Sequence, residues 1–250
     1  MDAIYNDLKL FHFQDKLDSL PPERPISAPL HVRFKPTNKC NHRCRYCIYR
    51  DSALQLGKHM DVRDELSREK FLEICRDLAD MGVRAVTFSG GGEPLLHPNI
   101  LEAARILVDG GVKLATLTNG SLLAGEVAAF FSAKATWVRI SMDGWDDASY
   151  ARYRSVRPGA FTQLLHNIEA FLRLGGPCAL SVVYNVDAEN WPHIPEVLDR
   201  LRDVGVRSVK VSALVVSDDS AQERAYHAPH AARVAAHAIS PNFFDLYSDK

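Results

Sequence analysis

The chain has 250 residues, of which 46% are hydrophobic and 24% charged, a composition typical of a globular protein with one sizeable core. The formal net charge is −1, so no overall basic field indicates a nucleic-acid partner. No apolar run approaches the roughly 20 residues of a membrane-spanning helix, and the acidic start MDAIYNDLKLFHFQDKL is unlike a secretion signal. We therefore expect a cytoplasmic protein with no membrane or nucleic-acid partner.

The pattern along the chain predicts alternating strands and helices after an N-terminal helix and proline-rich connector in residues 1–28. Several of the predicted helices end in glycine just before the next strand, as helix C-termini often do. The predicted strands are 30–35, 83–88, 112–117, 137–142, 179–184 and 206–214. The predicted helices are 67–82, 97–111, 122–133, 161–176 and 193–205, with a last one at about 220–238 before a tail at 241–250.

This order of elements predicts a βα unit repeated six times, with parallel strands joined by helical crossovers. Six units are fewer than the eight of a closed TIM barrel. We therefore expect an α/β fold in which residues 29–240 form a partial (β/α)6 TIM-like barrel. A flat doubly wound sheet is the alternative, but neither G-x-G-x-x-G nor G-x-x-x-x-G-K-[ST] supports it.

The unusual residues follow the predicted strands. A cysteine-rich segment follows the first strand, SGGGEP the second, TNG the third and DG the fourth, while Asn185 closes the fifth. The carboxyl ends of parallel strands form the edge at which α/β proteins build their sites. Five such coincidences at one edge predict a pocket there.

Three of the five cysteines, Cys40, Cys44 and Cys47, have the spacing C-x3-C-x2-C. Their odd total and the absence of a secretion signal argue against a disulfide scaffold. A zinc site would need a fourth ligand, and His42 lies in a cramped place between the first two cysteines. Three thiolates leave one metal position open, for water on zinc or for a ligand on one iron of an iron–sulfur cluster. The spacing favours the cluster and leaves zinc open, whereas Cys75 is predicted to be a core residue.

These motifs together resemble those of the radical S-adenosylmethionine (radical SAM) superfamily over roughly residues 30–215. CNHRCRYC, with Tyr46 before the third cysteine, resembles the cluster signature, and FSGGGEPLLHP resembles the GGE motif of the second strand. TNGSLL and RISMDG resemble motifs of the branch that includes MoaA-like and SPASM enzymes. No cysteine follows Cys178, so the C-terminal auxiliary-cluster region of many SPASM enzymes is not expected in this chain.

The resemblance implies an enzyme in which Cys40, Cys44 and Cys47 hold a 4Fe–4S cluster. S-adenosylmethionine would occupy the open iron, and an electron from a donor such as flavodoxin or ferredoxin would cleave it to a 5′-deoxyadenosyl radical. That radical would abstract hydrogen from a peptide, sugar or small-metabolite substrate. The alternative is an iron–sulfur redox-sensing or scaffold module without turnover.

The resemblance also implies ten cofactor-binding residues. Glycines in the second-strand motif would let the backbone approach a ligand closely. For the arginine after strand four, the register relative to Arg152 and Arg157 stays open, and strand six would offer backbone to the adenine. The implied residues are Tyr46, Gly91, Gly92, Glu93, Thr118, Asn119, Ser141, Arg154, Asn185 and Val211.

Two basic residues on the first predicted strand, Arg33 and Lys35, alternate with Val32 and Phe34. If the apolar pair faces the helices, the basic pair points into the barrel, where it could bind an anionic substrate. A solvated edge strand explains the same pattern.

Overall fold

The computed structural model describes residues 27–237, with side chains as far as Ala231, so the predicted N-terminal helix and C-terminal tail lie outside the described residues. Six strands form one sheet in the order β1-β2-β3-β4-β5-β6, and every neighbouring pair is parallel. The strands are β1 (His31–Phe34), β2 (Ala85–Phe88), β3 (Lys113–Thr118), β4 (Trp137–Met142), β5 (Ala179–Val186) and β6 (Val209–Ala213).

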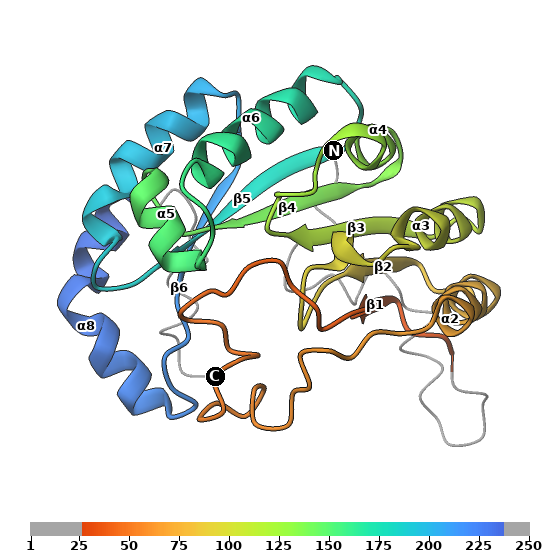
Figure 1. The fold of residues 1–250 in the computed structure, drawn as a ribbon, viewed down its shortest axis with the longest axis horizontal. Helices are drawn as coiled ribbons and strands as arrows, with labels where there is room; N and C mark the ends of the chain where they lie inside the picture. Colours follow the sequence, from red (N-terminus) through yellow and green to blue (C-terminus); the bar gives the residue numbers. More distant parts are fainter. Residues whose placement is uncertain (1–26, 238–250) are drawn as a thin grey trace.

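The strand order follows the chain order without the reversal that a doubly wound sheet requires. Figure 1 shows the sheet curving as an open crescent with helices along its outer side. This arrangement confirms the predicted partial barrel. The helices are α2 (Arg68–Asp80), α3 (Ile100–Asp109), α4 (Gly125–Lys134), α5 (Asp147–Arg154), α6 (Ala160–Arg173), α7 (Ile194–Asp203) and α8 (Ser220–His237), with short 3-10 turns η2 (Pro94–Leu96) and η3 (Trp191–His193).

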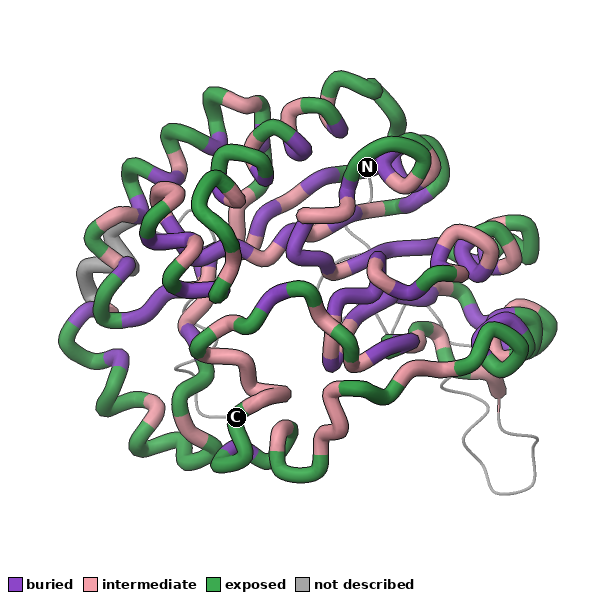
Figure 2. The backbone as a smooth tube through the Cα atoms, in the orientation of Figure 1, coloured by how far each residue is buried: buried purple, intermediate pink, exposed green. Residues whose placement is uncertain are grey.

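The core lies between the sheet and these helices, because alternate strand residues point toward them. Phe34 of β1 packs edge-on against Phe71 of α2 with ring centroids 5.2 Å apart, and Phe88 of β2 joins them. Buried stretches accordingly run along the strands and the inner sides of the helices in Figure 2. Arg33 therefore lies on the sheet face away from the helices, where it donates to Ser89 Oγ at 3.1 Å.

One helix was not predicted. Between β4 and β5 the chain forms α5 before α6, and Asp146 begins α5 with a capping box in which its side chain accepts from Ser149 N. The connection therefore carries two helices instead of one, and α5 places Arg154 beside the C-terminal edge of the sheet. Within residues 27–237, no helix is long and apolar enough to cross a membrane.

Candidate functional site

The long connection from β1 to α2, residues 35–67, carries the three clustered cysteines, and we call residues 38–50 the cysteine loop. All three thiols are free and partly exposed. The loop turns on itself, with Cys47 N donating to Cys44 O at 3.2 Å, while His42 N donates to Cys40 Sγ at 3.4 Å. Burial raises the pKa of the Cys40 thiol, and raises that of Cys44 to about 11.

The side chains around the cysteine loop suit the two metals that the sequence leaves open to different degrees. In the described residues, no group of three or more His, Cys, Asp or Glu side chains could hold a metal ion, as zinc would require. His42, considered as a fourth ligand, instead packs edge-on against Tyr150 at 6.1 Å between ring centroids. A cubane cluster takes each thiolate on a different iron, so three free thiols in one loop suit it.

The loop after β2 lies directly against the cysteine loop. Gly92 N donates to Thr37 O at 3.1 Å, and Glu93 N donates to Lys39 O at 2.9 Å. A Cβ atom on Gly92 would lie 2.0 Å from Lys39 O, and one on Gly91 would lie 2.3 Å from Asn38 Oδ1. Glycine is therefore required at Gly92 because two backbone segments meet there, whereas Gly91 lies against the Asn38 side chain; the sequence did not reveal this reason.

Glu93 joins the loops after β2 and β3. Its buried carboxylate accepts from Thr118 Oγ1 at 2.7 Å, Asn119 N at 2.7 Å and Leu95 N at 3.0 Å. Burial raises the pKa of Glu93, and these three donors oppose that rise. Asn119 Nδ2 also donates to Asn41 Oδ1 at 2.9 Å, which connects the same network to the cysteine loop. Three predicted site residues therefore lie in one hydrogen-bonded cluster.

Three more predicted residues form a network with Arg154, a fourth predicted residue whose guanidinium is buried. Its Nη2 donates to Ser141 Oγ at 3.0 Å and to Tyr46 Oη at 3.1 Å. Asn185 Nδ2 donates to Ser141 Oγ as well, at 3.0 Å. Of the arginines in this segment, Arg154 is buried in this network, whereas Arg152 pairs on the surface with Glu189.

Sequence reasoning missed the carboxylate partner of Arg154. Asp143 directly follows β4 and is fully buried, with its Oδ2 2.8 Å from the Arg154 guanidinium. Burial by itself lowers the pKa of Arg154, but the neighbouring Asp143 raises it overall. The signal is present in ISMDG, where the aspartate directly follows the predicted strand 137–142.

A second missed group fastens the cysteine loop to α5 and to the end of β5. Arg45 pairs with Asp187 at 2.8 Å, and its guanidinium lies 3.7 Å above the Tyr153 ring. Tyr153 Oη donates to Asp187 Oδ1 at 2.7 Å. The backbone adds bonds from Arg43 N to Arg154 O at 2.8 Å and from Arg45 N to Tyr153 O at 2.9 Å. No local pattern could reveal a pair separated by 142 positions.

Val211 stands apart from both networks. It pairs with Tyr184 in the register of β5 and β6, and its side chain is 1% exposed within the core. Only its backbone could therefore contact a ligand at the sheet edge.

The sequence matches one family over most of this core. Residues 34–201 match the family described as the radical SAM superfamily. The chain is 26% identical to the AdoMet-dependent heme synthase of Methanosarcina barkeri, over 76% of this chain and 52% of that protein. It is 33% identical to the GTP 3′,8-cyclase of Paracoccus denitrificans, over 58% of this chain and 42% of that protein. It is 29% identical to the antilisterial bacteriocin subtilosin biosynthesis protein AlbA of Bacillus subtilis, over 72% of this chain and 38% of that protein. The chain therefore spans about half of these relatives, or less.

Solved structures show the same fold. Streptococcus suis SuiB bound to S-adenosylmethionine superposes with a TM-score of 0.66 at 17% identity, over 99% of this chain and 59% of SuiB. The protein anSMEcpe with bound AdoMet gives a TM-score of 0.59 at 21% identity, over 75% of this chain and 53% of that one. At these identities, both comparisons show a shared fold and nothing more.

Proposed function

Since the chain belongs to the radical SAM superfamily, we propose that it reductively cleaves S-adenosylmethionine at a 4Fe–4S cluster held by Cys40, Cys44 and Cys47. When bound, the cluster supplies the electron for this cleavage, and the resulting 5′-deoxyadenosyl radical abstracts hydrogen from the substrate. One observation carries the proposal: loops following several parallel strands are hydrogen-bonded to the cysteine loop at one edge of the sheet.

The hydrogen-bonded group around Glu93 would fix the methionine end of S-adenosylmethionine. Glu93 is held by three donors, so the backbone of Gly91 and Gly92 is fixed beside the cysteine loop. Backbone carbonyl groups in that position suit the ammonium group of a bound amino acid. Thr118 and Asn119 complete this side of the proposed site through Glu93.

The arginine network would orient hydroxyl groups toward the rest of the cofactor. Ser141 Oγ accepts from both Arg154 and Asn185, so both of its lone pairs are used and its hydrogen is left to donate. Tyr46 Oη also accepts from Arg154, which leaves the phenol hydrogen free to donate. We therefore assign Arg154 as a positioning residue, Ser141 and Tyr46 as donors to cofactor oxygen or nitrogen atoms, and Val211 as a backbone contact to the adenine.

The substrate belongs to the class of peptides, sugars or small metabolites. Similarity to AlbA and to the SuiB fold, which was solved with the precursor peptide SuiA, supports a peptide. Similarity to GTP 3′,8-cyclases supports a small molecule. A flavodoxin or ferredoxin would supply the electron in the cytoplasm, where reducing conditions keep free thiols available.

The test uses protein reconstituted anaerobically with iron and sulfide, then given a reductant and S-adenosylmethionine. We expect chromatography with mass spectrometry to detect 5′-deoxyadenosine. Cys47→Ala should abolish both cluster and product, because one of three thiolates is lost. Cys75→Ala is the matched control: Cys75 lies on the fully buried face of α2, so cluster and product should remain.

Two outcomes would contradict the proposal. Full loading of iron and sulfide without any 5′-deoxyadenosine would favour a redox-sensing or scaffold module. Stoichiometric zinc in anaerobically purified protein, with no iron uptake on reconstitution, would exclude both readings.

A further inference from the structure

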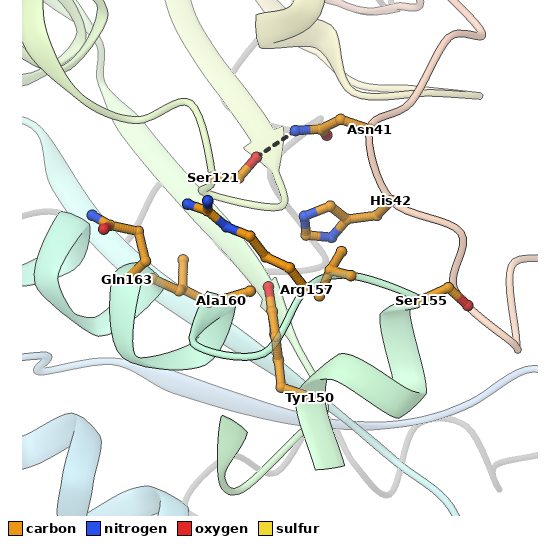
Figure 3. Close-up of a pocket in the computed structure, with 10 residues that line it drawn as sticks. Asn41, His42, Ser121, Tyr150, Ser155, Arg157, Ala160 and Gln163 are labelled. Carbon is orange, nitrogen blue, oxygen red and sulfur yellow. Dashed lines mark hydrogen bonds between the residues drawn. The ribbon is translucent and has the colours of Figure 1, made fainter. Parts of the chain in front are cut away.

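A pocket of roughly 410 Å³ lies beside the cysteine loop, between that loop, the loop after β3 and the α5–α6 connection (Figure 3). Its polar lining includes Asn41, His42, Ser121, Tyr150, Arg157 and Gln163. None of the three cysteines and none of Gly91, Gly92 and Glu93 lines it. The pocket is therefore separate from the proposed cofactor site.

Three groups facing this pocket have hydrogen-bonding capacity that the described protein does not use. The His42 ring is 6% exposed, and its Nδ1 is buried without any hydrogen-bond partner. Tyr150 is 1% exposed, its hydroxyl group makes no hydrogen bond within the described residues, and Figure 3 shows that group pointing into the pocket. A buried polar atom without a partner carries a free-energy cost, so the unpartnered Nδ1 of His42 at this cavity indicates a ligand.

The third group is the guanidinium of Arg157. It forms no ion pair among the described residues, whereas other arginines of this region, Arg152 and Arg154, each pair with a carboxylate. Figure 3 shows the Arg157 side chain extending across the pocket toward Ser121. Ser155, two residues earlier, has φ of 50°, the only positive φ of a described non-glycine residue. That left-handed turn redirects the chain after α5 and so places Arg157 at the pocket.

Three other polar residues of the wall are held in place by hydrogen bonds. Asn41 Nδ2 donates to Ser121 Oγ at 2.9 Å, and Ser121 Oγ donates to Asn119 Oδ1 at 2.6 Å. Gln163 Nε2 donates to Asn167 Oδ1 at 3.0 Å. No aspartate or glutamate lines the pocket. The pocket therefore offers a guanidinium, a phenol and an imidazole as hydrogen-bond donors and has no carboxylate. Such a group of donors is suited to binding an oxyanion.

We propose that this pocket binds the phosphate or carboxylate group of a small metabolite through Arg157, Tyr150 and His42. A single phosphate would leave much of the 410 Å³ empty, so the rest of the metabolite has room beside it. The site goes beyond the proposed function, because it uses neither the cysteines nor the S-adenosylmethionine residues. His42 lies between Cys40 and Cys44, so a ligand bound here would contact the cysteine loop.

The test measures protection of Arg157 from phenylglyoxal in the anaerobically reconstituted protein, with modified peptides quantified by mass spectrometry. Inorganic phosphate and malonate are the two probes, each compared with chloride at equal ionic strength. Protection by phosphate identifies a phosphate site and protection by malonate a carboxylate site. We expect modification of Arg157 to slow several-fold, while Arg173, exposed at the far end of α6 and paired with Glu169, is unaffected.

Titration calorimetry then measures how tightly variants of the pocket residues bind the probe that protects Arg157. Arg157→Gln should weaken binding about tenfold or more, because a charge-assisted hydrogen bond is lost. Tyr150→Phe should weaken it several-fold and keeps the buried ring, and Arg173→Gln should change nothing. The proposal is overturned if neither probe protects Arg157, or if Arg157→Gln and Arg173→Gln bind equally well. Because 5′-deoxyadenosine is not measured, failure here is distinct from failure of the proposed function.

Discussion

Arg154 is the residue on which half of the candidate site depends. Its guanidinium contacts Asp143, Ser141 and Tyr46, which reach it from β4 and the cysteine loop. A buried ion pair is weak evidence for stability, since desolvation offsets most of the Coulomb attraction. The pair is better explained by what it positions: with its charge balanced by Asp143, Arg154 can hold two hydroxyl groups in place without presenting a net charge.

Replacing Asp143 by asparagine tests this description. The substitution keeps the shape but leaves the Arg154 guanidinium buried without a countercharge, so we expect a loss of about 3 kcal/mol in the free energy of unfolding. Urea unfolding of cluster-free protein measures it. Glu196→Gln on α7 is the matched control, because Glu196 and its partner Arg200 are both 44% exposed; its cost should stay below about 1 kcal/mol. If both variants lose the same free energy of unfolding, the description of Asp143 and Arg154 as a buried ion pair is contradicted.

At the scale of elements, the sequence predicted all six strands because each one alternates or is continuously apolar. In β4, Val138, Ile140 and Met142 are buried while Trp137, Arg139 and Ser141 are partly exposed, which is the period of two that the sequence displays. Helix α5 was missed because DASYARYR is short and has no apolar stripe. Its local signal is the capping pair of Asp146 and Ser149, which is too common to predict a helix by itself.

The site was predictable to the extent that its motifs are local. Cys40, Cys44 and Cys47 lie within one short segment, so their spacing alone indicated a metal group. The pairing of Arg45 with Asp187 depends on the curvature of the whole sheet, which no local pattern contains. The glycines illustrate an intermediate case: the sequence predicted a close approach, and only the structure showed that Gly92 approaches the cysteine loop itself.

This contact between two loops leads to a prediction for Gly92→Ala. The new Cβ would lie 2.0 Å from Lys39 O, so the loop after β2 and the cysteine loop must separate. We expect a clear loss of iron and sulfide on reconstitution, measured by elemental analysis and the absorbance of the cluster. Gly175→Ala is the control: its φ is +65° in open space, so it should cost about 1 kcal/mol of stability but leave loading unchanged. Normal loading of Gly92→Ala would contradict the contact.

At the scale of the molecule, the β1–α2 connection spans the open side of the crescent that the sheet leaves unclosed (Figure 1). Arg45 fastens it to Asp187 after β5, and Gln55 N donates to Asp218 Oδ2 beyond β6 at 2.6 Å. Elements from both ends of the sheet are thereby connected without a closed barrel. The cysteine loop is consequently held by a few polar contacts, in contrast to the strands, which are held by the core.

Arg45→Gln should therefore loosen the cysteine loop and leave the sheet intact. The lost ion pair is partly exposed, so we expect amide hydrogen exchange at Arg43 and Cys47 to speed up by about tenfold or less. Amides of β3 and β4 should exchange as before, because the core that protects them is unchanged. Arg202→Gln on α7, which removes an exposed pair with Asp199, should alter neither region. If exchange in the loop is the same in both variants, the loop is held by its backbone bonds to α5, and Arg45 contributes nothing to closing the crescent.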